Sequence, residues 1–510
     1  QSTSYKSAPD RTASFFGRAL YDYKNRYYAT LTVRADGSTK FAPGKQWGYF
    51  PAGSIAWRIS NEKWMKPIKF ISDLKLRASY GLAGNNRIGN DLWHNIYRVY
   101  SGTSAPAFGN EEYNYYQFAD QTYLYDPDLK WETTITRNIG LDFGFFRNRL
   151  SGTVDVYWNT TKDLLVPSII PNSSGYSRQM TNVGQTSNKG VEISLDAKII
   201  QTKDFQLSAN FNVAFNKNKV DKLATGETEW KTKASLSNWY GTYNYKMEVG
   251  KSMGLIYGFV NDGFYKVDDF DFDATTKKWT LKPGIPDNSS FSSGNFAFKP
   301  GAMKFKKLSD SESNLITEDD MTVIGDTNPK VTGGFGLSGN WKNLDFTAFF
   351  NYMCDFDVLN VNKLYLHSAV RRNYSNLSTD MNLANRFRYV DDAGVNVSSD
   401  PVALAALNEN AKTYSWMSVT QGITMTDLVE DGSFLRLSTL TVGYTLPKHW
   451  LRSLGVKSLR LYFSGSNLFT ITGYSGYDPE VNIQKGLTPG IDNNVTPRSR
   501  VYTVGVNLNF

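Results

Sequence analysis

Cysteine, histidine and long apolar runs are scarce in this chain, and each scarcity excludes a class of protein. The 510 residues include one cysteine, Cys354, so an intrachain disulfide framework is excluded. The three histidines, His94, His367 and His449, are far apart, and none lies beside another ligand type at metal-site spacing. No run approaches the ~18 apolar residues of a membrane helix, so spanning by helices is excluded.

Catalytic motifs are also missing. The sequence has neither G-x-S-x-G nor H-E-x-x-H. One stretch, "GFGLSG", matches G-x-G-x-x-G at Gly334, Gly336 and Gly339. These glycines lie within an alternating strand pattern, whereas a dinucleotide site needs them between a strand and a helix. We therefore predict strand glycines there, and a protein that is not an enzyme.

Charge and aromatic content narrow the class of protein further. The net charge of +8 is spread along the chain, which favours solvated loops over a nucleic-acid surface. Aromatic residues make up 15% of the chain, with 31 Tyr, 31 Phe and 12 Trp. Such a composition suits rings at a membrane interface or at sugar and peptide surfaces.

Apolar residues recur at every second position through most of the chain, which is the primary signal of half-buried strands. In "LKLRASYGL" the apolar set runs from Leu74 to Leu82, and Lys75, Arg77 and Ser79 oppose it. About thirteen such strands are predicted by this template. They lie near residues 14 to 23, 26 to 35, 47 to 59, 71 to 83, 130 to 145, 149 to 160, 188 to 200, 204 to 217, 330 to 341, 343 to 354, 433 to 446, 457 to 470 and 499 to 510.

The connections between these strands alternate between short and long. Short links such as "YKNR" and "QTKD" alternate with long segments rich in Gly, Ser, Asn and Asp. Outer-membrane barrels sort their connections in this way, with tight periplasmic turns and long extracellular loops. Aromatic pairs at the short turns, such as Tyr27 with Tyr28 and Phe145 with Phe146, fit an interfacial girdle.

Two positions break the alternation. Arg137 falls in the apolar phase, where an arginine at the membrane midplane costs ~2 to 4 kcal/mol, so we predict a bulge there or a position above the hydrocarbon band. The apolar phase also shifts between Leu437 and Leu440, which predicts a second bulge.

The strand count predicts that this chain does not complete a barrel. If the short turns are periplasmic, the first and last strands run in the same direction, and an odd number of strands should precede residue 14. The last strand alternates up to the aromatic Phe510. It is expected to satisfy its backbone by closing the barrel against the first strand.

Several long blocks resemble one family. "FFGRALYDYKNRYYATLTVRADGSTKF", "LKWETTITRNIGLDFGFFRNRLSG", "GDTNPKVTGGFGLSGNWKNLDF" and "GSNLFTITGYSGYDPEVN" are similar to successive blocks of the SusC/RagA family of TonB-dependent transporters from Bacteroidetes outer membranes. The resemblance implies an all-β transmembrane antiparallel barrel of 22 strands, an N-terminal plug, and a SusD-like lipoprotein as an extracellular lid. It also implies uptake of oligosaccharides or peptides, driven through TonB.

The resemblance assigns residues 1–510 to the C-terminal part of the barrel, with the plug domain and early strands outside this chain. Substrate contacts are then expected from aromatic residues in the long loops, because flat rings stack on sugars and peptide side chains. The candidates are Trp93, Tyr97, Tyr100, Tyr115, Tyr116, Trp230, Trp239 and Tyr240. Packing within the loops, or contact with the lid, is an equal alternative for each of them.

Calcium is the only cofactor for which the sequence contains a candidate motif. "DDFDFDATTKKW" places Asp269, Asp271 and Asp273 as in a calcium loop, but Ala274 and Thr280 stand where that loop needs Gly and Glu. In a later acidic segment the resemblance implies a glycine where this chain has Leu315. We therefore predict solvated acidic loops, no metal site and no cofactor, with calcium in an extracellular loop left open.

Two alternatives to the importer remain at this stage. A soluble carbohydrate-binding β-protein, such as a propeller, would also give many strands and Trp-rich loops, but it predicts repeats of ~40 to 50 residues that we do not find. An enzyme built on an outer-membrane barrel would need a nucleophile and a base converging on one site.

Overall fold

The computed structural model describes residues 10–94, 97–100, 116–119, 123–224, 226–234, 236, 243–291, 298–367, 376–416, 422–451, 455–480 and 486–510. The side chains of residues 97–100, 116–119, 169 and 172 lie outside that description. Within the described ranges, no helix combines the length and the apolar character needed to cross a membrane.

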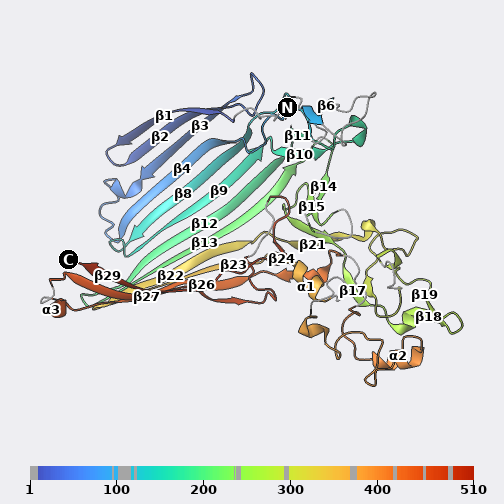
Figure 1. Cartoon of the computed structure of the whole chain (residues 1–510). Coiled ribbons are helices and arrows are strands. Elements are labelled where there is room, and N and C mark those ends of the chain that lie inside the picture. Colours follow the sequence, from blue (N-terminus) through green and yellow to red (C-terminus); the bar gives the residue numbers. More distant parts are fainter. Residues whose placement is uncertain are drawn as a thin grey trace. The chain divides into compact units, whose positions relative to one another are not determined.

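Thirteen long strands hydrogen-bond in the order β1-β2-β3-β4-β8-β9-β12-β13-β22-β23-β26-β27-β29 (Figure 1). Their bounds are β1 Thr12–Tyr23, β2 Tyr27–Ser38, β3 Trp47–Arg58, β4 Ile71–Asn85, β8 Glu132–Phe145, β9 Leu150–Lys162, β12 Gln185–Gln201, β13 Phe205–Lys222, β22 Val331–Trp341, β23 Leu344–Cys354, β26 Phe434–Thr445, β27 Ser458–Thr472 and β29 Val501–Asn509. All thirteen predicted strands are confirmed. Each long strand pairs with the long strand that precedes or follows it in the chain, whether a short turn or a long segment joins the two.

The chain divides into two compact units. Unit 1 comprises residues 1–228, 249–251 and 335–342, and unit 2 comprises residues 229–248, 252–334 and 343–510. Unit 1 holds the strands from β1 to β13 and most of β22. Unit 2 holds β23, β26, β27 and β29 together with the shorter elements between them.

The short turns of unit 1 contain residues with left-handed backbone. Between β1 and β2, Lys24 and Asn25 have φ of 56° and 52°. Positive φ at two successive residues matches the right-handed twist of the flanking strands, and Asn adopts it more readily than most residues. The turn between β8 and β9 has positive φ at three successive residues, Phe146, Arg147 and Asn148. Local sequence therefore fixes these hairpins and their register.

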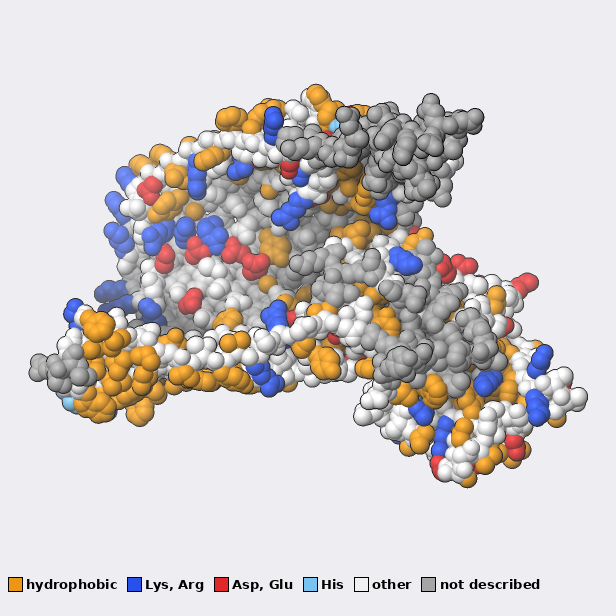
Figure 2. Space-filling view, in the orientation of Figure 1, with side chains coloured by type: hydrophobic (Ala, Val, Ile, Leu, Met, Phe, Trp, Pro, Cys, Tyr) orange, Lys and Arg blue, Asp and Glu red, His pale blue; other side chains and the backbone are white. Residues whose placement is uncertain are grey.

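The strands of unit 1 expose their apolar side chains. Ile55, Ala78 and Ile139 are paired across β3, β4 and β8, and 65% of Ile55 and 48% of Ile139 are exposed. We call this side of unit 1 the apolar face. Charged residues such as Arg77 and Asp142 occupy the opposite side, which we call the polar face. In Figure 2, blue and red side chains form a band over the polar face, and orange side chains line the outer edge of the same strands.

The structure confirms one predicted bulge and contradicts the other. The register of β26 shifts on both sides of Ser438, against β23 and against β27, as the phase change predicted. Of the two possibilities predicted at Arg137, the bulge is wrong, because Ile135 pairs with Thr160 and Asn138 with Tyr157 in one unbroken register, and a position above the hydrocarbon band stays a prediction. Arg137 therefore stays on the apolar face, opposite Tyr80.

The shorter elements occupy the long connections. The strands are β5 Tyr97–Tyr100, β6 Tyr116–Ala119, β7 Tyr123–Leu124, β10 Leu165–Ile169, β11 Arg178–Asn182, β14 Glu229–Thr232, β15 Tyr245–Glu248, β16 Leu255–Gly258, β17 Asn261–Phe264, β18 Phe270–Asp273, β19 Lys278–Leu281, β20 Met303–Phe305, β21 Thr322–Asp326, β24 Asp357–Asn360, β25 Val429–Asp431 and β28 Ile491–Asp492. The α-helices are α1 Val361–Leu366, α2 Pro401–Leu407 and α3 Lys448–Leu451. Short 3₁₀ turns are η1 Ile59–Asn61, η3 Asn172–Ser174, η4 Val267–Asp269, η5 Ser289–Phe291, η6 Glu318–Asp320, η7 Thr379–Met381 and η8 Thr426–Leu428.

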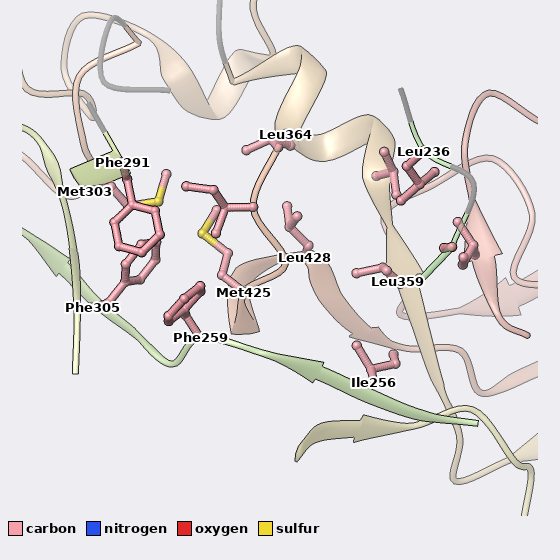
Figure 3. Packing of buried hydrophobic residues seen from close by; sticks show 14 of the residues in the cluster. Leu236, Ile256, Phe259, Phe291, Met303, Phe305, Leu359, Leu364, Met425 and Leu428 are labelled. Atoms are coloured by element: carbon pink, nitrogen blue, oxygen red, sulfur yellow. The ribbon is translucent and has the colours of Figure 1, made fainter. Parts of the chain in front are cut away.

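The long connections of unit 2 pack into a body with its own core. We call the described parts of residues 229–248, 252–330 and 357–432 the loop body. Phe259, Phe291 and Phe305 lie close together in Figure 3. Their ring centroids are 5.0 to 5.6 Å apart. Leu359 and Met425 join the same cluster and are fully buried. Segments more than a hundred residues apart therefore share one hydrophobic core.

Candidate functional site

An ion-pair network crosses the polar face of unit 1. Arg77 on β4 lies 2.7 Å from Asp142 on β8 and 3.0 Å from Asp155 on β9. Lys75 approaches Asp142 to 3.8 Å. Gly140 lies between the partners, and a Cβ there would stand 2.4 Å from Asp155 Oδ1 and 2.6 Å from Arg77 Nη2. The glycine therefore leaves the space through which the guanidinium reaches the second carboxylate.

A second ion pair lies at the end of β3. Arg58 donates from Nε and Nη2 to the two carboxylate oxygens of Asp73, at 2.9 and 3.1 Å. Ser60 Oγ donates to the same carboxylate at 3.0 Å. A bidentate pair of this kind fixes orientation as well as charge. The polar face therefore carries organised charges of both signs.

A pocket of about 540 Å³ opens on the polar face near the other ends of the strands. Arg34 donates from Nε to Asp36 at 2.7 Å and from Nη2 to Ser14 Oγ at 3.2 Å. Phe50 and Trp131 form an aromatic side of the pocket, with ring centroids 5.5 Å apart in an edge-to-face arrangement. The pocket combines the guanidinium of Arg34 with flat rings, which together can hold a polar solute that has an apolar face.

The sequence carries one signal for this pocket that our prediction missed. Phe50 stands in the polar phase of β3, between Tyr49 and Pro51 of the apolar phase. It is only 6% exposed. Cβ atoms at Gly48 and Gly84 would lie 2.5 and 2.0 Å from its ring, so both glycines make room for it. An aromatic residue out of phase between glycines marks a packed site.

The predicted aromatic residues are distributed over both units. Trp93 lies in unit 1, half-buried, with its ring 4.5 Å from the ring of His94. Trp230 lies in unit 2 on β14, paired with Met247 of β15.

For most of the other predicted aromatics only the backbone is described, or nothing. The backbones of Tyr97, Tyr100 and Tyr116 belong to the hairpin β5–β6, in which Tyr100 is opposite Tyr116. Tyr115, Trp239 and Tyr240 lie outside the described residues. A substrate role for the eight aromatics stays a prediction.

The acidic segments of the loop body are organised by their own hydrogen bonds. Asp273 accepts from Thr275 N at 2.8 Å and from Thr276 Oγ1 at 2.7 Å, which closes the β18–β19 hairpin. Asp269 lies 3.6 Å from Lys304. Within the described ranges, no group of three or more His, Cys, Asp or Glu side chains is arranged to hold a metal ion. Calcium in an extracellular loop stays an open expectation.

Asp320 organises the later acidic segment. Its carboxylate accepts from the backbone N–H groups of Leu308, Ser309 and Thr317 at 2.8 to 2.9 Å, and Lys307 Nζ lies at 3.1 Å. Burial alone would raise the pKa of Asp320, but these donors hold its pKa at about 2. The carboxylate therefore stays ionised and holds the segment together.

A buried histidine joins three segments of the loop body. His367 shares a hydrogen bond of 3.0 Å between Nδ1 and the hydroxyl of Tyr414, and its Nε2 lies 2.7 Å from Asp380. Burial lowers the pKa of His367 below its usual range, although Asp380 opposes that shift. The three side chains hold together the C-terminal end of α1, the η7 turn and the segment around Tyr414.

Comparison with known proteins identifies the family. A family profile described as "TonB dependent receptor-like, beta-barrel" matches residues 1–468. The chain belongs to the TonB-dependent receptor family. This receptor chain is 32% identical to TonB-dependent receptor P3 of Formosa agariphila over 98% of its own length and 45% of that protein. It is 31% identical to TonB-dependent receptor SusC of Bacteroides thetaiotaomicron, over 98% of this chain and 43% of SusC.

Solved structures agree with that assignment. The receptor chain superposes on a structure titled "Structure of the RagAB peptide transporter" with a TM-score of 0.73 and 26% identity, covering 98% of this chain and 48% of that one. A RagAB peptide importer in the "closed-closed" state gives a TM-score of 0.70 at 27% identity. The chain spans just under half the length of the relatives it matches.

The comparisons confirm the predicted SusC/RagA resemblance, the all-β barrel class and the outer-membrane location. They also contradict the soluble carbohydrate-binding alternative, because the receptors of this family are outer-membrane barrels. The family consists of transporters rather than enzymes. The assignment of residues 1–510 to the C-terminal part of a 22-stranded barrel stays a prediction.

Proposed function

We propose that this receptor chain forms the barrel wall of an energy-coupled importer of the SusC/RagA type. Its apolar face contacts lipid, and its polar face borders the path of the solute. The observation that carries the proposal is the separation of the two faces: Ile55 is 65% exposed on one side, and Arg77 bridges two carboxylates on the other. A soluble protein would bury the first set of side chains.

The cargo we propose is an oligosaccharide or a peptide. The pocket bounded by Arg34, Asp36, Phe50 and Trp131 supports this class, because it offers a cation, an anion and flat rings within one cavity. A relative of known structure is titled a peptide transporter, which agrees with the same class. The cargo is expected to leave the protein unmodified, since we propose no catalytic role for this chain.

The partners we propose are a SusD-like surface lipoprotein at the extracellular side and TonB, reached through the part of the receptor that precedes this chain. Co-purification of the full-length receptor from its own outer membrane tests both the location and the lipoprotein. Recovery of the receptor in the soluble fraction, without detergent, would overturn the proposal.

Uptake measurements test the solute path. Arg34→Gln in the full-length receptor removes the guanidinium from the pocket. We expect uptake of labelled oligosaccharide or peptide to fall about tenfold, because hydrogen bonds to charged groups contribute ~1.5 to 3 kcal/mol. Lys24→Gln, in the short β1–β2 turn, is the matched control. Equal uptake by both variants, at equal receptor levels in the membrane, would contradict a role for this pocket.

A further inference from the structure

A groove on the apolar face of unit 1 has features of a specific site. It has a volume of about 770 Å³ and crosses β1, β2, β3, β4, β8 and β9. Its lining includes the small residues Ala29, Gly53 and Ala78, which we call its floor, and the larger Tyr21, Ile55 and Tyr80. The space above Gly53 is open, since the nearest atom to a Cβ placed there would be Thr30 O at 3.5 Å.

The groove continues along the strands towards the short turns. A second apolar hollow of about 470 Å³ shares Tyr21, Ala29, Ile55 and Ala78 with the first. It ends at the stacked rings of Tyr27 and Trp57, whose centroids are 6.4 Å apart. From the level of Gly53 to that of Trp57 the groove runs about 13 Å along the strands. That length accommodates much of an acyl chain.

A cation stands at the opposite end of the groove. The guanidinium of Arg137 lies 6.0 Å from the ring centroid of Tyr80, and Nη1 donates to Trp158 O at 3.4 Å and Thr160 Oγ1 at 3.3 Å. These two contacts are long and neutral. In the part of the chain that the structure describes, no carboxylate forms an ion pair with Arg137. Among the described residues, the positive charge on this face therefore has no counter-charge.

Other basic residues follow Arg137 on the same face. Lys189 on β12 is paired with Trp158, and Lys217 on β13 is paired with Lys189. Both lysines are exposed. By contrast, the apolar phase of β1, β2, β3, β4, β8 and β9 contains no Asp or Glu. A second copy of this chain docking through the same strands would offer no acid to these cations.

The position of Arg137 along the membrane normal suits contact with a lipid headgroup. It stands eight positions before Phe145, which ends β8 at the short turn with the Phe145–Phe146 ring pair. At ~3.3 Å per residue and a tilt of ~40°, the guanidinium is about 20 Å above that girdle. The apolar band of such barrels is ~25 Å tall, so Arg137 lies near its extracellular rim. Headgroup phosphates of the outer leaflet are within reach of an arginine there.

We propose that this groove binds one phosphate-bearing lipid of the outer leaflet. The phosphate pairs with the Arg137 guanidinium, and an acyl chain lies on the floor of Ala29, Gly53 and Ala78. A charge-assisted pair between arginine and phosphate explains why an arginine persists in the apolar phase without a bulge. The lipid would thereby become a fixed part of the barrel wall over β3, β4 and β8.

Native mass spectrometry of the full-length receptor in detergent tests the proposal, with lipid A and dephosphorylated lipid A as probes. We expect the receptor to retain lipid A about tenfold more tightly than the dephosphorylated form. Arg137→Gln should abolish that preference. Gly53→Leu, which fills the floor, should weaken both lipids alike. Lys24→Gln, in the short turn, is the control and should bind as the unaltered receptor does.

Several results would overturn the proposal. One is an unchanged phosphate preference in Arg137→Gln, with thermal unfolding showing that the variant is folded. Displacement of lipid A by millimolar inorganic phosphate would show a phosphate site rather than a lipid site. A change of oligomeric mass in Gly53→Leu with unaltered lipid binding would assign the groove to a protein interface.

Discussion

The strands of unit 1 and the loop body of unit 2 use the same residue types in opposite ways. In unit 1, large apolar side chains such as Ile55 and Tyr80 are more than half exposed, and the charged residues contact one another. In the loop body, Phe259, Phe305 and Leu359 are at most 2% exposed. The difference teaches that the surrounding solvent decides which side chains are buried. Apolar side chains of a membrane barrel can face lipid, whereas those of the loop body must be shielded from water in a core of their own.

The largest contrast is expected from removing one apolar side chain in each region. Phe259→Ala leaves a cavity among Phe291 and Phe305 and should lower the free energy of unfolding of the loop body by about 4 kcal/mol. Ile55→Ala removes an exposed side chain and should change stability in detergent by less than about 1 kcal/mol. Chemical denaturation followed by limited proteolysis measures both. Similar losses in the two variants would show that the exposed face of unit 1 is packed against protein.

Removing a buried charge should cause the next largest loss of stability. Arg436 on β26 is 2% exposed and pairs with Asp478 at 2.5 Å and with Glu480 at 2.7 Å. Arg436→Met leaves two buried carboxylates, of which Glu480 keeps Arg498 at 3.2 Å, and should cost about 3 kcal/mol. Arg77→Met on the half-exposed polar face is the matched comparison and should cost about 1 kcal/mol. Thermal unfolding of both variants decides whether burial, rather than the number of partners, sets the cost.

Acid should loosen the part of the loop body that Asp320 holds together. Because the pKa of Asp320 is about 2 in the folded protein and 3.8 is its ordinary value, the group stabilises the folded state by about 2 kcal/mol above pH 4, and this contribution is lost as the pH falls towards 2. Proteolysis of residues 307–320 should therefore rise at low pH. Asp320→Asn should show that susceptibility already at pH 6, whereas the neighbouring exposed Asp319→Asn should not. An identical pH profile in Asp320→Asn and the unaltered protein would contradict this role.

The smallest effect on stability is expected from filling the space at Gly140 on the polar face. Gly140→Ala places a Cβ against Asp155 and Arg77 and should separate that ion pair, at a cost of about 1 kcal/mol. Gly17→Ala on β1 is the control, since no atom lies within 4 Å of a Cβ there. Thermal unfolding compares the two. A cost as large for Gly17→Ala would mean that strand glycines matter for the backbone and not for the ion pair.

Much of the sheet could be predicted because its signal is local. Alternation and turn residues such as Asn25 specify strands and hairpins without any distant partner. The phase shift near Leu437 predicted the bulge at Ser438 for the same reason. At Arg137 the phase break allowed a bulge or a position above the hydrocarbon band, and the local pattern could not choose; the register of β8 excludes the bulge and keeps the arginine on the apolar face.

The candidate site and the loop core could not be predicted from local patterns. Ser14, Arg34, Phe50 and Trp131 come from separate strands or their flanks, and only the register of the sheet brings them around one pocket. Phe259 meets Phe305, and Leu359 and Met425 join them, across long stretches of irregular sequence. The aromatics predicted to contact substrate came from loop position alone, which says nothing about which rings converge.

The amino-acid sequence by itself determined the strands and their two faces, because both depend on neighbours one or two positions apart, and the spacing of the strands along the chain gave the order of short and long connections. Only the tertiary structure decided which polar residues share a pocket, how Arg77 reaches across Gly140, and where the loops form a core. Those features depend on contacts between residues far apart in the chain, and such contacts exist only after the sheet register and the loop packing are fixed.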